Sequence, residues 1–233
     1  EYNPYEFIKT NVLGANNLIE SCIEKNVKKI IALSTDKAAA PVNLYGATKL
    51  CSDKLFVAAN NIIGSRNTTF SVVRYGNVMG SRGSVIPLFL NKKKNEPFKI
   101  THPDMTRFNI TLEEGVNFVI HCLINSIGKE IFVPKLPSCR IVDLAKAIDI
   151  KSKMKIIGIR PGEKLHEEMI TYSDSFNALE TKNFYLILPE LKNYNEYFKK
   201  FKAKKVTKNF SYNSRDNKKF LTTNQIKKLL IYI

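Results

Sequence analysis

The sequence LSTDKAAAPVNLYGATK, residues 33–49, is the most informative part of this chain. The residues before it, KKIIAL at 28–33, are typical of a buried parallel strand, and residues 45–60 have the composition of a helix. The polar triplet at 35–37 therefore falls at the carboxyl end of a strand. Because ligands of open α/β sheets bind at that edge, the stretch predicts both the kind of sheet and the place of a site.

A tyrosine and a lysine stand four residues apart at the start of the expected helix, Tyr45 and Lys49. Side chains at this spacing share one face of a helix. An ammonium group beside a phenol favours the phenolate and lowers the pKa of the phenol. We therefore expect Tyr45 to exchange a proton with a substrate hydroxyl near neutral pH.

Helical and strand patterns alternate along the rest of the chain. The patterns predict helices over residues 4–25, 45–61, 85–94, 111–125 and 141–148 and after Gly162, and strands over residues 28–34, 69–75, 98–101, 130–133, 154–159 and 184–188. Such alternation is typical of an α/β fold with a doubly wound, mostly parallel sheet.

The composition of the 233 residues, 44% hydrophobic and 25% charged, is that of an ordinary globular protein. No run of 18 apolar residues or signal peptide is visible, so no membrane partner is expected. The cysteines, Cys22, Cys51, Cys122 and Cys139, form no Cys-x-x-Cys pair, which is typical of free thiols in a reducing cytoplasm. The three histidines have no metal-ligand spacing, and we predict no metal site.

The net charge of +16 suggests a nucleic-acid binder, but the distribution of the charge argues against this interpretation. From Lys182 onward there are thirteen Lys or Arg and only three Asp or Glu. The excess thus belongs to a Lys- and Asn-rich C-terminal segment, where a solvated lysine surface is the simpler explanation. We expect no nucleic-acid partner.

Four blocks carry a family resemblance, and they occur in the family's order. They are the Thr-Asp-Lys triplet with YGATK at 45–49, SVVRYGNV at 71–78, MTRF at 105–108 and IRPGEKLHE at 159–167. Together they resemble the extended short-chain dehydrogenases/reductases that act on nucleotide sugars. Within that branch, the chain looks like the C5-inverting UDP-N-acetylglucosamine 4,6-dehydratases of the pseudaminic acid pathway.

The resemblance implies a Rossmann-like sheet with a small α/β substrate-binding lobe. Residues 1–80 would form the catalytic half of the dinucleotide-binding domain. Residues 81–190 would form the lobe, interleaved with returning Rossmann elements, and residues 191–233 a basic C-terminal segment. No glycine-rich phosphate loop opens the chain. We therefore expect the first strands, roughly 80–100 residues or about three strand-helix units, to be missing, and the isolated chain to be inactive and poorly stable.

The implied reaction begins with oxidation at C4 of the sugar, with NADP as the hydride acceptor and NAD not excluded. Water then leaves across C5–C6, the hydride returns to C6, and C5 is reprotonated from the opposite face. Tyr45 would take the C4 hydroxyl proton, and Lys49 would lower the pKa of Tyr45 and hold the nicotinamide ribose. Thr35 would hydrogen-bond the C4 oxygen.

Two neighbouring residues would carry the elimination and the inversion. Asp36, kept protonated in a sheltered site, would protonate the leaving C6 hydroxyl. Lys37 would be the base at C5, which requires a depressed pKa that burial and Lys49 would favour. Retaining dehydratases carry Glu at the position of Lys37, so the resemblance ties this lysine to C5 inversion. A solvated loop ion pair is the alternative interpretation of Asp36 and Lys37.

Other positions follow from the remaining blocks. Cofactor contacts are expected, besides Tyr45 and Lys49, at Ser34, Tyr75 and Asn11, and substrate contacts at Asn77, Arg82, Arg107, Arg160 and Glu163. The Arg160 guanidinium would bind the diphosphate, and Glu163 would accept both uridine ribose hydroxyls. An Asx turn at Asn77 and a structural Arg160–Glu163 pair are the alternatives.

Several readings of the whole chain remain open. A UDP-hexose 4-epimerase would need Tyr45 and Lys49 but would have no use for Asp36 and Lys37. Membrane-anchored dehydratases typically carry Met at the position of Tyr45, which disfavours that branch. A non-catalytic, truncated nucleotide-sugar-binding remnant is the third alternative. The family forms homo-oligomers, and the resemblance implies a dimer or hexamer built through helices 4–25 and 45–61.

Overall fold

The computed structural model describes residues 3–93, 95–190 and 194–231. Two compact units make up the chain, and each is built from three separate segments. Unit 1 comprises Glu1–Tyr75, Val116–Lys135 and Glu168–Tyr212, and unit 2 comprises Gly76–Gly115, Leu136–Glu167 and Asn213–Ile233. The chain therefore leaves and re-enters unit 1 twice, and segments of the two units alternate along the sequence.

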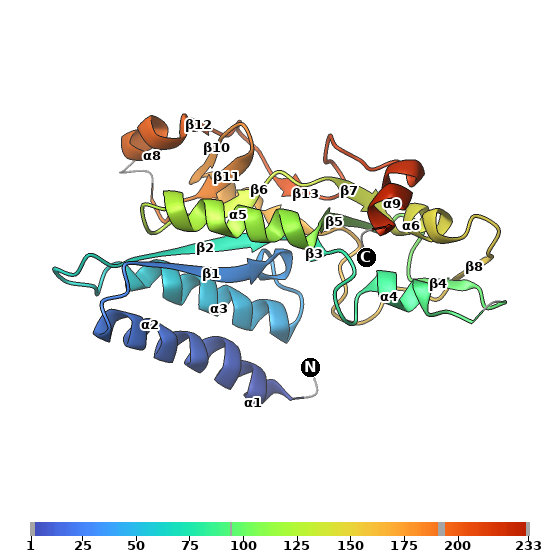
Figure 1. Ribbon diagram of the computed structural model, residues 1–233, viewed down its shortest axis with the longest axis horizontal. Helices are drawn as coiled ribbons and strands as arrows, with labels where there is room; N and C mark the ends of the chain where they lie inside the picture. The colour runs from blue at the N-terminus through green and yellow to red at the C-terminus, as the bar shows by residue number, and fades with distance from the viewer. Residues whose placement is uncertain (1–2, 94, 191–193, 232–233) are drawn as a thin grey trace. The chain divides into compact units, whose positions relative to one another are not determined.

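Unit 1 contains a six-stranded sheet in the order β1-β2-β6-β11-β10-β12 (Figure 1). Its strands are β1 (Lys29–Thr35), β2 (Thr69–Tyr75), β6 (Ile131–Pro134), β10 (Ala178–Glu180), β11 (Phe184–Ile187) and β12 (Lys204–Lys205). The pairs β1–β2 and β2–β6 are parallel, and the remaining three are antiparallel. The expected doubly wound sheet is confirmed, with antiparallel strands added at one edge.

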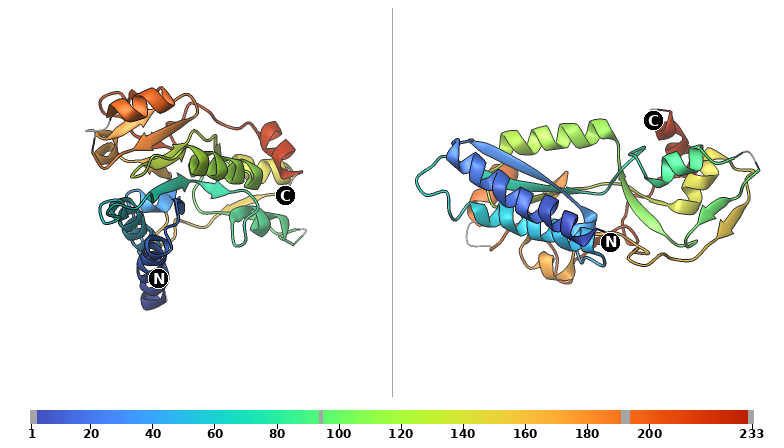
Figure 2. Two further views of the ribbon diagram at one scale, coloured as in Figure 1. Left: turned by 60° about the vertical axis from the view of Figure 1, so that its left-hand side comes forward. Right: turned by 90° about the horizontal axis from the view of Figure 1, so that it is seen from below.

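Helices cover both faces of the parallel strands. The first helical segment runs through α1 (Pro4–Phe7), a π-helical stretch (Ile8–Leu13) and α2 (Gly14–Glu24). The other helices of unit 1 are α3 (Leu44–Ala59), α7 (Tyr172–Ser175), α8 (Tyr194–Phe201) and most of α5 (Leu112–Asn125), which begins in unit 2. Figure 1 shows α2 and α3 on one side of β1 and β2, and α5 on the other. In both views of Figure 2, α2 lies beside α3.

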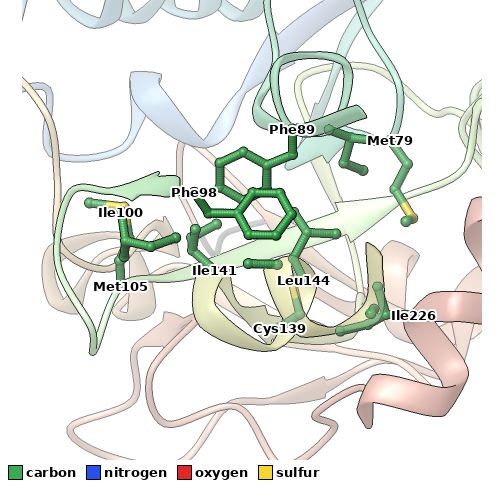
Figure 3. Packing of buried hydrophobic residues seen from close by; sticks show 12 residues of the cluster. Met79, Phe89, Phe98, Ile100, Met105, Cys139, Ile141, Leu144 and Ile226 are labelled. Carbon is green, nitrogen blue, oxygen red and sulfur yellow. The ribbon is translucent and has the colours of Figure 1, made fainter. Parts of the chain in front are cut away.

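Unit 2 has small sheets around its own apolar core. Its elements are β3 (Asn77–Val78), α4 (Val85–Leu90), β4 (Phe98–Ile100), β5 (Thr106–Ile110), β7 (Ser138–Arg140), α6 (Ile141–Ile148), β8 (Met154–Ile156) and α9 (Thr223–Leu230). Strand β5 lies between β3 and β7, and β4 pairs with β8. Figure 3 shows the core, where the rings of Phe89 and Phe98 pack with centroids 4.8 Å apart.

The helix expected after Gly162 is wrong. The backbone at Gly162 has φ of +72°, which turns the chain, and the carbonyl of Leu165 accepts from the amide of Thr106 at 3.2 Å. The segment therefore lies alongside β5 instead of closing helical turns, and it continues into the short strand β9 (Glu168–Ile170), which pairs with β13 (Tyr212–Asn213).

Two further elements end earlier than expected. Strand β8 ends at Ile156, shortly before Gly158 adopts φ of +88°, a conformation that a strand does not use. Helix α4 ends at Leu90, and residue 94 of the expected helix lies outside the described residues, as do residues 191–193 and 232–233 of the basic segment. Among the described residues, every helix falls short of the length and apolarity that a membrane span requires.

Candidate active site

The polar triplet after β1 folds into a single tight turn. Thr35 ends the strand, and its Oγ1 accepts a hydrogen bond from the amide of Lys37 at 3.3 Å, which caps the short 3-10 helix Asp36–Ala38. The same hydroxyl donates to Oδ1 of Asp36 at 2.8 Å. Because Thr35 pairs with Tyr75 in the parallel ladder, the turn lies at the carboxyl edge of β1 and β2, as the sequence predicts.

Asp36 and Lys37 form an ion pair with very unequal exposure. The Nζ of Lys37 lies 3.0 Å from Oδ1 of Asp36, and the two side chains are 33% and 0% exposed. The second carboxylate oxygen of Asp36, Oδ2, is buried and has no hydrogen-bond partner in the described structure. A solvated loop ion pair would expose both groups, so this carboxylate is a sheltered one aimed at its lysine.

Helix α3 brings Tyr45 and Lys49 to this turn. It begins after Asn43, whose Oδ1 accepts from the amide of Gly46 at 2.8 Å and satisfies one unpaired donor of the first turn. A Cβ added at Gly46 would collide with the carbonyl oxygen of Lys37. Glycine therefore allows the close approach of the first turn of α3 to the strand-end turn.

The electrostatics of Tyr45 and Lys49 differ from the pattern that their spacing suggests. Burial raises the pKa of Tyr45, and Lys37 acts against this shift while Asp36 adds to it. Burial also lowers the pKa of Lys49, opposed by the negative charge of Asp53. The Nζ of Lys49 donates to the carbonyl of Leu33 at 2.7 Å. The lysine that lowers the pKa of the phenol in this structure is therefore Lys37.

The three residues expected near the cofactor have different surroundings. The hydroxyl of Ser34 is nearly buried and donates to Oδ2 of Asp53 at 2.8 Å. The amide of Asn11 donates to Oγ1 of Thr48 at 3.0 Å, which ties the first helical segment to α3. Tyr75 is half-buried at the end of β2, and burial raises its pKa.

Sequence reasoning missed a buried network below this cluster. Arg74 is 2% exposed, and its Nη2 lies 3.2 Å from Oδ2 of Asp53. Its Nη1 donates to the carbonyl of Met169 and lies 3.3 Å from Oδ2 of Asp174. The available signal was the arginine inside an otherwise apolar strand, because a buried charge requires a partner.

The candidate substrate residues all belong to unit 2. Arg107 on β5 is 8% exposed and lies 3.5 Å from Oε1 of Glu163 and from Oε1 of Glu167. The other oxygen of Glu163, Oε2, accepts from the backbone amide of Arg160 at 3.3 Å, while the Arg160 side chain is exposed. The structure therefore brings Arg107, Arg160 and Glu163 together. The side chain of Glu163 pairs with Arg107, whereas the alternative interpretation of the sequence paired it with the side chain of Arg160.

The other two candidate residues, Asn77 and Arg82, lie in an earlier segment of unit 2. Asn77 lies on β3, where it pairs with Asn109 of β5, and Arg82 is exposed in the turn before α4. Among the described residues, no three His, Cys, Asp or Glu side chains are placed to hold a metal ion.

The unit 1 cluster fits the nicotinamide end of a dinucleotide. A phenol and an ammonium group stand at the carboxyl end of parallel strands, where such ligands bind. Lys49 and Tyr45 are the residues that would hold such a group. Ser34 and Asn11 already use their polar groups within the protein.

Comparison with known proteins places the chain in a family. The family model described as "Polysaccharide biosynthesis protein" matches residues 1–189. Over 234 residues, the chain is 52% identical to the "UDP-N-acetylglucosamine 4,6-dehydratase (inverting)" of Campylobacter jejuni subsp. jejuni serotype O:23/36 (strain 81-176), covering 97% of this chain and 70% of that protein. It is 40% identical to the "UDP-glucose 4-epimerase" of Rickettsia canadensis (strain McKiel), covering 99% and 69%.

Solved structures agree with the sequence relatives. The crystal structure of Pen from Bacillus thuringiensis superposes with a TM-score of 0.86 at 36% identity, covering the whole of this chain and 71% of that one. A UDP-N-acetylglucosamine 4-epimerase from Methanobrevibacter ruminantium M1, at 18% identity and a TM-score of 0.60, shares the fold. The chain belongs to the polysaccharide biosynthesis protein family, in its extended short-chain dehydrogenase/reductase form.

Proposed function

We propose that this protein is an inverting UDP-N-acetylglucosamine 4,6-dehydratase, a lyase that removes water across C5–C6 of the sugar and inverts C5. The observation that carries the proposal is the buried Asp36 paired with Lys37 beside Tyr45 and Lys49. Relatives that are 52% and 54% identical bear the same name over most of the chain.

Oxidation at C4 needs a group that accepts the hydroxyl proton. Tyr45 is that group in our proposal, with Thr35 as the hydrogen-bonding partner of the C4 oxygen and Lys49 as the cation that holds the ribose. When bound, the nicotinamide supplies reversible hydride transfer. Lys37, whose charge already favours the tyrosinate, assists the first step by lowering the pKa of Tyr45.

Elimination needs an acid at the C6 hydroxyl and a base at C5. The Asp36–Lys37 pair supplies both when the proton that the two groups share lies on Asp36. With the shared proton on Oδ1 of Asp36, Nζ of Lys37 is a neutral amine 3.0 Å away. The amine then removes the C5 proton, the carboxyl proton goes to the C6 oxygen, and water leaves. The pair ends as an ammonium carboxylate, so proton number and charge balance.

For the nucleotide end of the substrate, we propose the group formed by Arg107, Glu163 and Arg160. Glu163 would accept the ribose hydroxyls, and the exposed Arg160 guanidinium would bind the diphosphate as a planar fork. Arg107 is mostly enclosed by carboxylates and carbonyls, so its main part would be to hold Glu163 in place. Asn77 and Arg82 complete the proposed set.

A UDP-hexose 4-epimerase is the second candidate, because relatives with that name are 40% identical over 99% of the chain. An epimerase oxidises C4 with the same Tyr45 and Lys49 and returns the hydride to C4. It has no step for a buried acid paired with a lysine base. The geometry of Asp36 and Lys37 therefore favours the dehydratase.

The finer points of the proposal are the cofactor, the product's use, the compartment and the assembly. We propose NADP, with NAD as the alternative to be separated by titration, and a product destined for pseudaminic acid. Free cysteines throughout the chain support a reducing cytoplasm. Exposed apolar side chains on the first helical segment, Tyr5, Ile8, Leu13 and Leu18, support a homo-oligomer, a dimer or a hexamer.

The decisive experiment incubates the protein, expressed from its complete reading frame, with UDP-N-acetylglucosamine and NADP in heavy water and follows the product by NMR. A 4-keto-6-deoxy sugar with deuterium at C5 and the L-arabino configuration is the expected result. Retained C5 configuration would contradict inversion. A C4 epimer formed without loss of water would establish the epimerase instead.

Matched variants then assign the steps. Lys37→Gln is expected to oxidise C4 more slowly, because Tyr45 loses a nearby positive charge. It is expected to lose C5 hydrogen exchange and elimination by a factor of about 10² or more, the range of general acid-base catalysis. Tyr45→Phe, which removes one oxygen atom, is expected to stop the reaction before C5 exchange. If Lys37→Gln exchanged the C5 hydrogen at the normal rate, the base would have to be another group.

A further inference from the structure

A buried network of charges lies directly behind the proposed catalytic residues, and each member stands next to one of them. Ser34 precedes Thr35, and Arg74 precedes Tyr75. Asp53 lies one helical turn after Lys49 on α3. Ser34 and Arg74 are paired in the ladder of β1 and β2, so the two strands deliver their side chains to Asp53 together.

Asp53 is the centre of this network. Its Oδ2 accepts from the hydroxyl of Ser34 at 2.8 Å and lies 3.2 Å from Nη2 of Arg74. The side chains of Asp53 and Arg74 are each 2% exposed. A charge so completely removed from water is costly unless it is paired and hydrogen-bonded. Here the two charges pair with each other and both Nη atoms of Arg74 have partners, while its buried Nε has none in the described structure.

The same arginine has a second, more peripheral partner. Its Nη1 lies 3.3 Å from Oδ2 of Asp174, a side chain that is 25% exposed and that also accepts from the amide of Thr171. Arg74 is therefore held between two carboxylates, of which only Asp53 belongs to the helix that carries Lys49. This asymmetry offers a matched comparison.

Lys49 does not contact Asp53 in an ion pair; its Nζ donates to the carbonyl of Leu33. Asp53 thus acts on Lys49 through the electrostatic effect of its charge and by fixing the position of α3, and not through a hydrogen bond. The groups that act on Tyr45 or Lys49 come from three elements: Asp36 and Lys37 from the strand-end turn, Tyr75 from β2, and Asp53 from α3. Arg74 from β2 contacts Asp53. On the first helical segment, Lys9 and Glu6 pair with each other at the surface.

We propose that Asp53, fixed by Arg74 and Ser34, is a positioning residue that anchors the turn of α3 after Lys49 to β1 and β2 and places a negative charge near that lysine. Only the importance of Lys49 for turnover rests on the proposed function. The electrostatic effect on Lys49 is a property of the folded protein. Burial lowers the pKa of this lysine, and Asp53 opposes that shift. Removing the carboxylate leaves the effect of burial on the pKa of Lys49 without that opposition.

The first test measures Lys49 itself and needs no substrate. The protein from its complete reading frame is acylated briefly at a series of pH values, and the labelling of each lysine is read by peptide mass spectrometry. Exposed Lys54 on the same helix is the internal reference. Asp53→Asn is expected to lower the pH of half-maximal labelling of Lys49 by about one unit, a typical effect of a nearby charge. Lys54 should not change.

Asp174→Asn is the matched control, since it removes the other carboxylate from the same arginine. We expect this variant to be less stable than the unaltered protein but to leave the Lys49 profile within about 0.3 pH unit. Equal shifts in both variants, or no Lys49 shift in folded Asp53→Asn, would overturn the proposal. If Asp53→Asn does not fold, the double variant Asp53→Asn/Arg74→Met removes the unpaired buried charge, and the same downward shift is expected there.

The second test is the pH profile of dehydratase turnover. A reaction that requires protonated Lys49 loses kcat as pH rises through the pKa of that lysine. The alkaline limb of kcat should therefore move to lower pH in Asp53→Asn, by the amount found by labelling, while KM changes less and Asp174→Asn keeps the normal limb. If the unaltered protein shows no turnover, the proposed function fails, and the labelling profiles still decide the role of Asp53.

Discussion

Gly46 is the residue that lets the first turn of α3 lie against the turn after β1. An added Cβ would collide with the carbonyl oxygen of Lys37 and lie 3.0 Å from Cβ of Pro41. Because backbone has to move to relieve this contact, Gly46→Ala is expected to lower the free energy of unfolding by about 1–3 kcal/mol, measured by urea denaturation. Turnover per folded molecule should also fall, because Lys37 and Tyr45 would separate.

The control for this prediction is Gly115→Ala in α5. Its Cβ would meet only Cδ1 of Ile110 at 3.9 Å, an ordinary contact. Alanine is favoured over glycine in a helix by about 1 kcal/mol, so the control should be neutral or slightly more stable. Equal losses in the two variants would contradict the role given to the contact at Gly46.

The cysteines offer a second prediction about single residues. Burial raises the pKa of Cys139 to about 11, and Cys122 is also buried, whereas Cys51 is exposed on α3. Because the thiolate is the reactive form, iodoacetamide at pH 8 should alkylate Cys51 and leave Cys139 and Cys122 unmodified in the folded protein. Mass spectrometry after partial labelling measures this order. Labelling of Cys139 at the rate of Cys51 would contradict the burial.

At the candidate site, sequence spacing could predict which residues gather but not which contacts they make. The Tyr-x-x-x-Lys pattern placed Tyr45 and Lys49 on one face of a helix, and the structure has them there. The pattern carried no information on the partner of Lys49, because the carbonyl of Leu33 that it binds comes from another element. Asp53 and Arg74 are 21 residues apart, and only the folded sheet brings their side chains together.

Among the elements, strands with long apolar runs were predictable and short polar ones were not. The apolar runs predict the parallel strands β1, β2 and β6. In the structure β2 and β6 are buried, whereas β1 is mostly half-buried. Strands β7, β9 and β10 have three residues each, and long-range partners define them, so no local pattern marks them. The same cause explains the wrong helix after Gly162, where pairing with β5 outweighs local preference.

Glu130 is a buried carboxyl group just before β6, and it controls how the stability of this element depends on pH. Its Oε1 accepts from the amide of Ile127 at 2.7 Å, and burial raises its pKa above the ordinary value of 4.5. A raised folded pKa contributes stability that is complete below pH 4.5 and is lost as pH rises through the folded pKa. Glu130→Gln cannot ionise, so its stability relative to the unaltered protein should increase with pH.

Urea denaturation at pH 5 and pH 8 measures this effect. The difference in unfolding free energy between Glu130→Gln and the unaltered protein should favour the variant more at pH 8. Glu113→Gln, at an exposed glutamate of α5, is the isosteric control and should show no comparable change. A difference that is the same at both pH values would mean that Glu130 ionises as readily in the folded chain as in the unfolded one.

At the scale of the whole molecule, the chain passes back and forth between two units, and each unit has its own hydrophobic core. Local sequence patterns cannot assign segments to these units, because consecutive segments of the chain belong to different cores. Phe98 lies in the core of unit 2, is 1% exposed and packs against Phe89. Phe98→Ala should cost about 3–5 kcal/mol through the cavity that it leaves.

Hydrogen exchange distinguishes how far that loss extends. We expect backbone amides of β5, such as Phe108, to lose protection, while amides of β2, such as Val73, keep most of theirs. The sheet of unit 1 serves as the internal control. Equal loss of protection in both strands would mean that the two units unfold as one cooperative body.

The π-helical stretch Ile8–Leu13 lets the first helical segment accommodate a change of length. A wider turn holds one more residue than an α-helix would, so deleting a single residue there would restore regular winding and leave what precedes it facing nearly the same way. Phe7, whose ring lies 6.0 Å from that of Tyr45, would then keep its place. The same one-codon deletion in the regular turns of α2 would rotate Phe7 by about 100° and misalign a wall of the catalytic cluster.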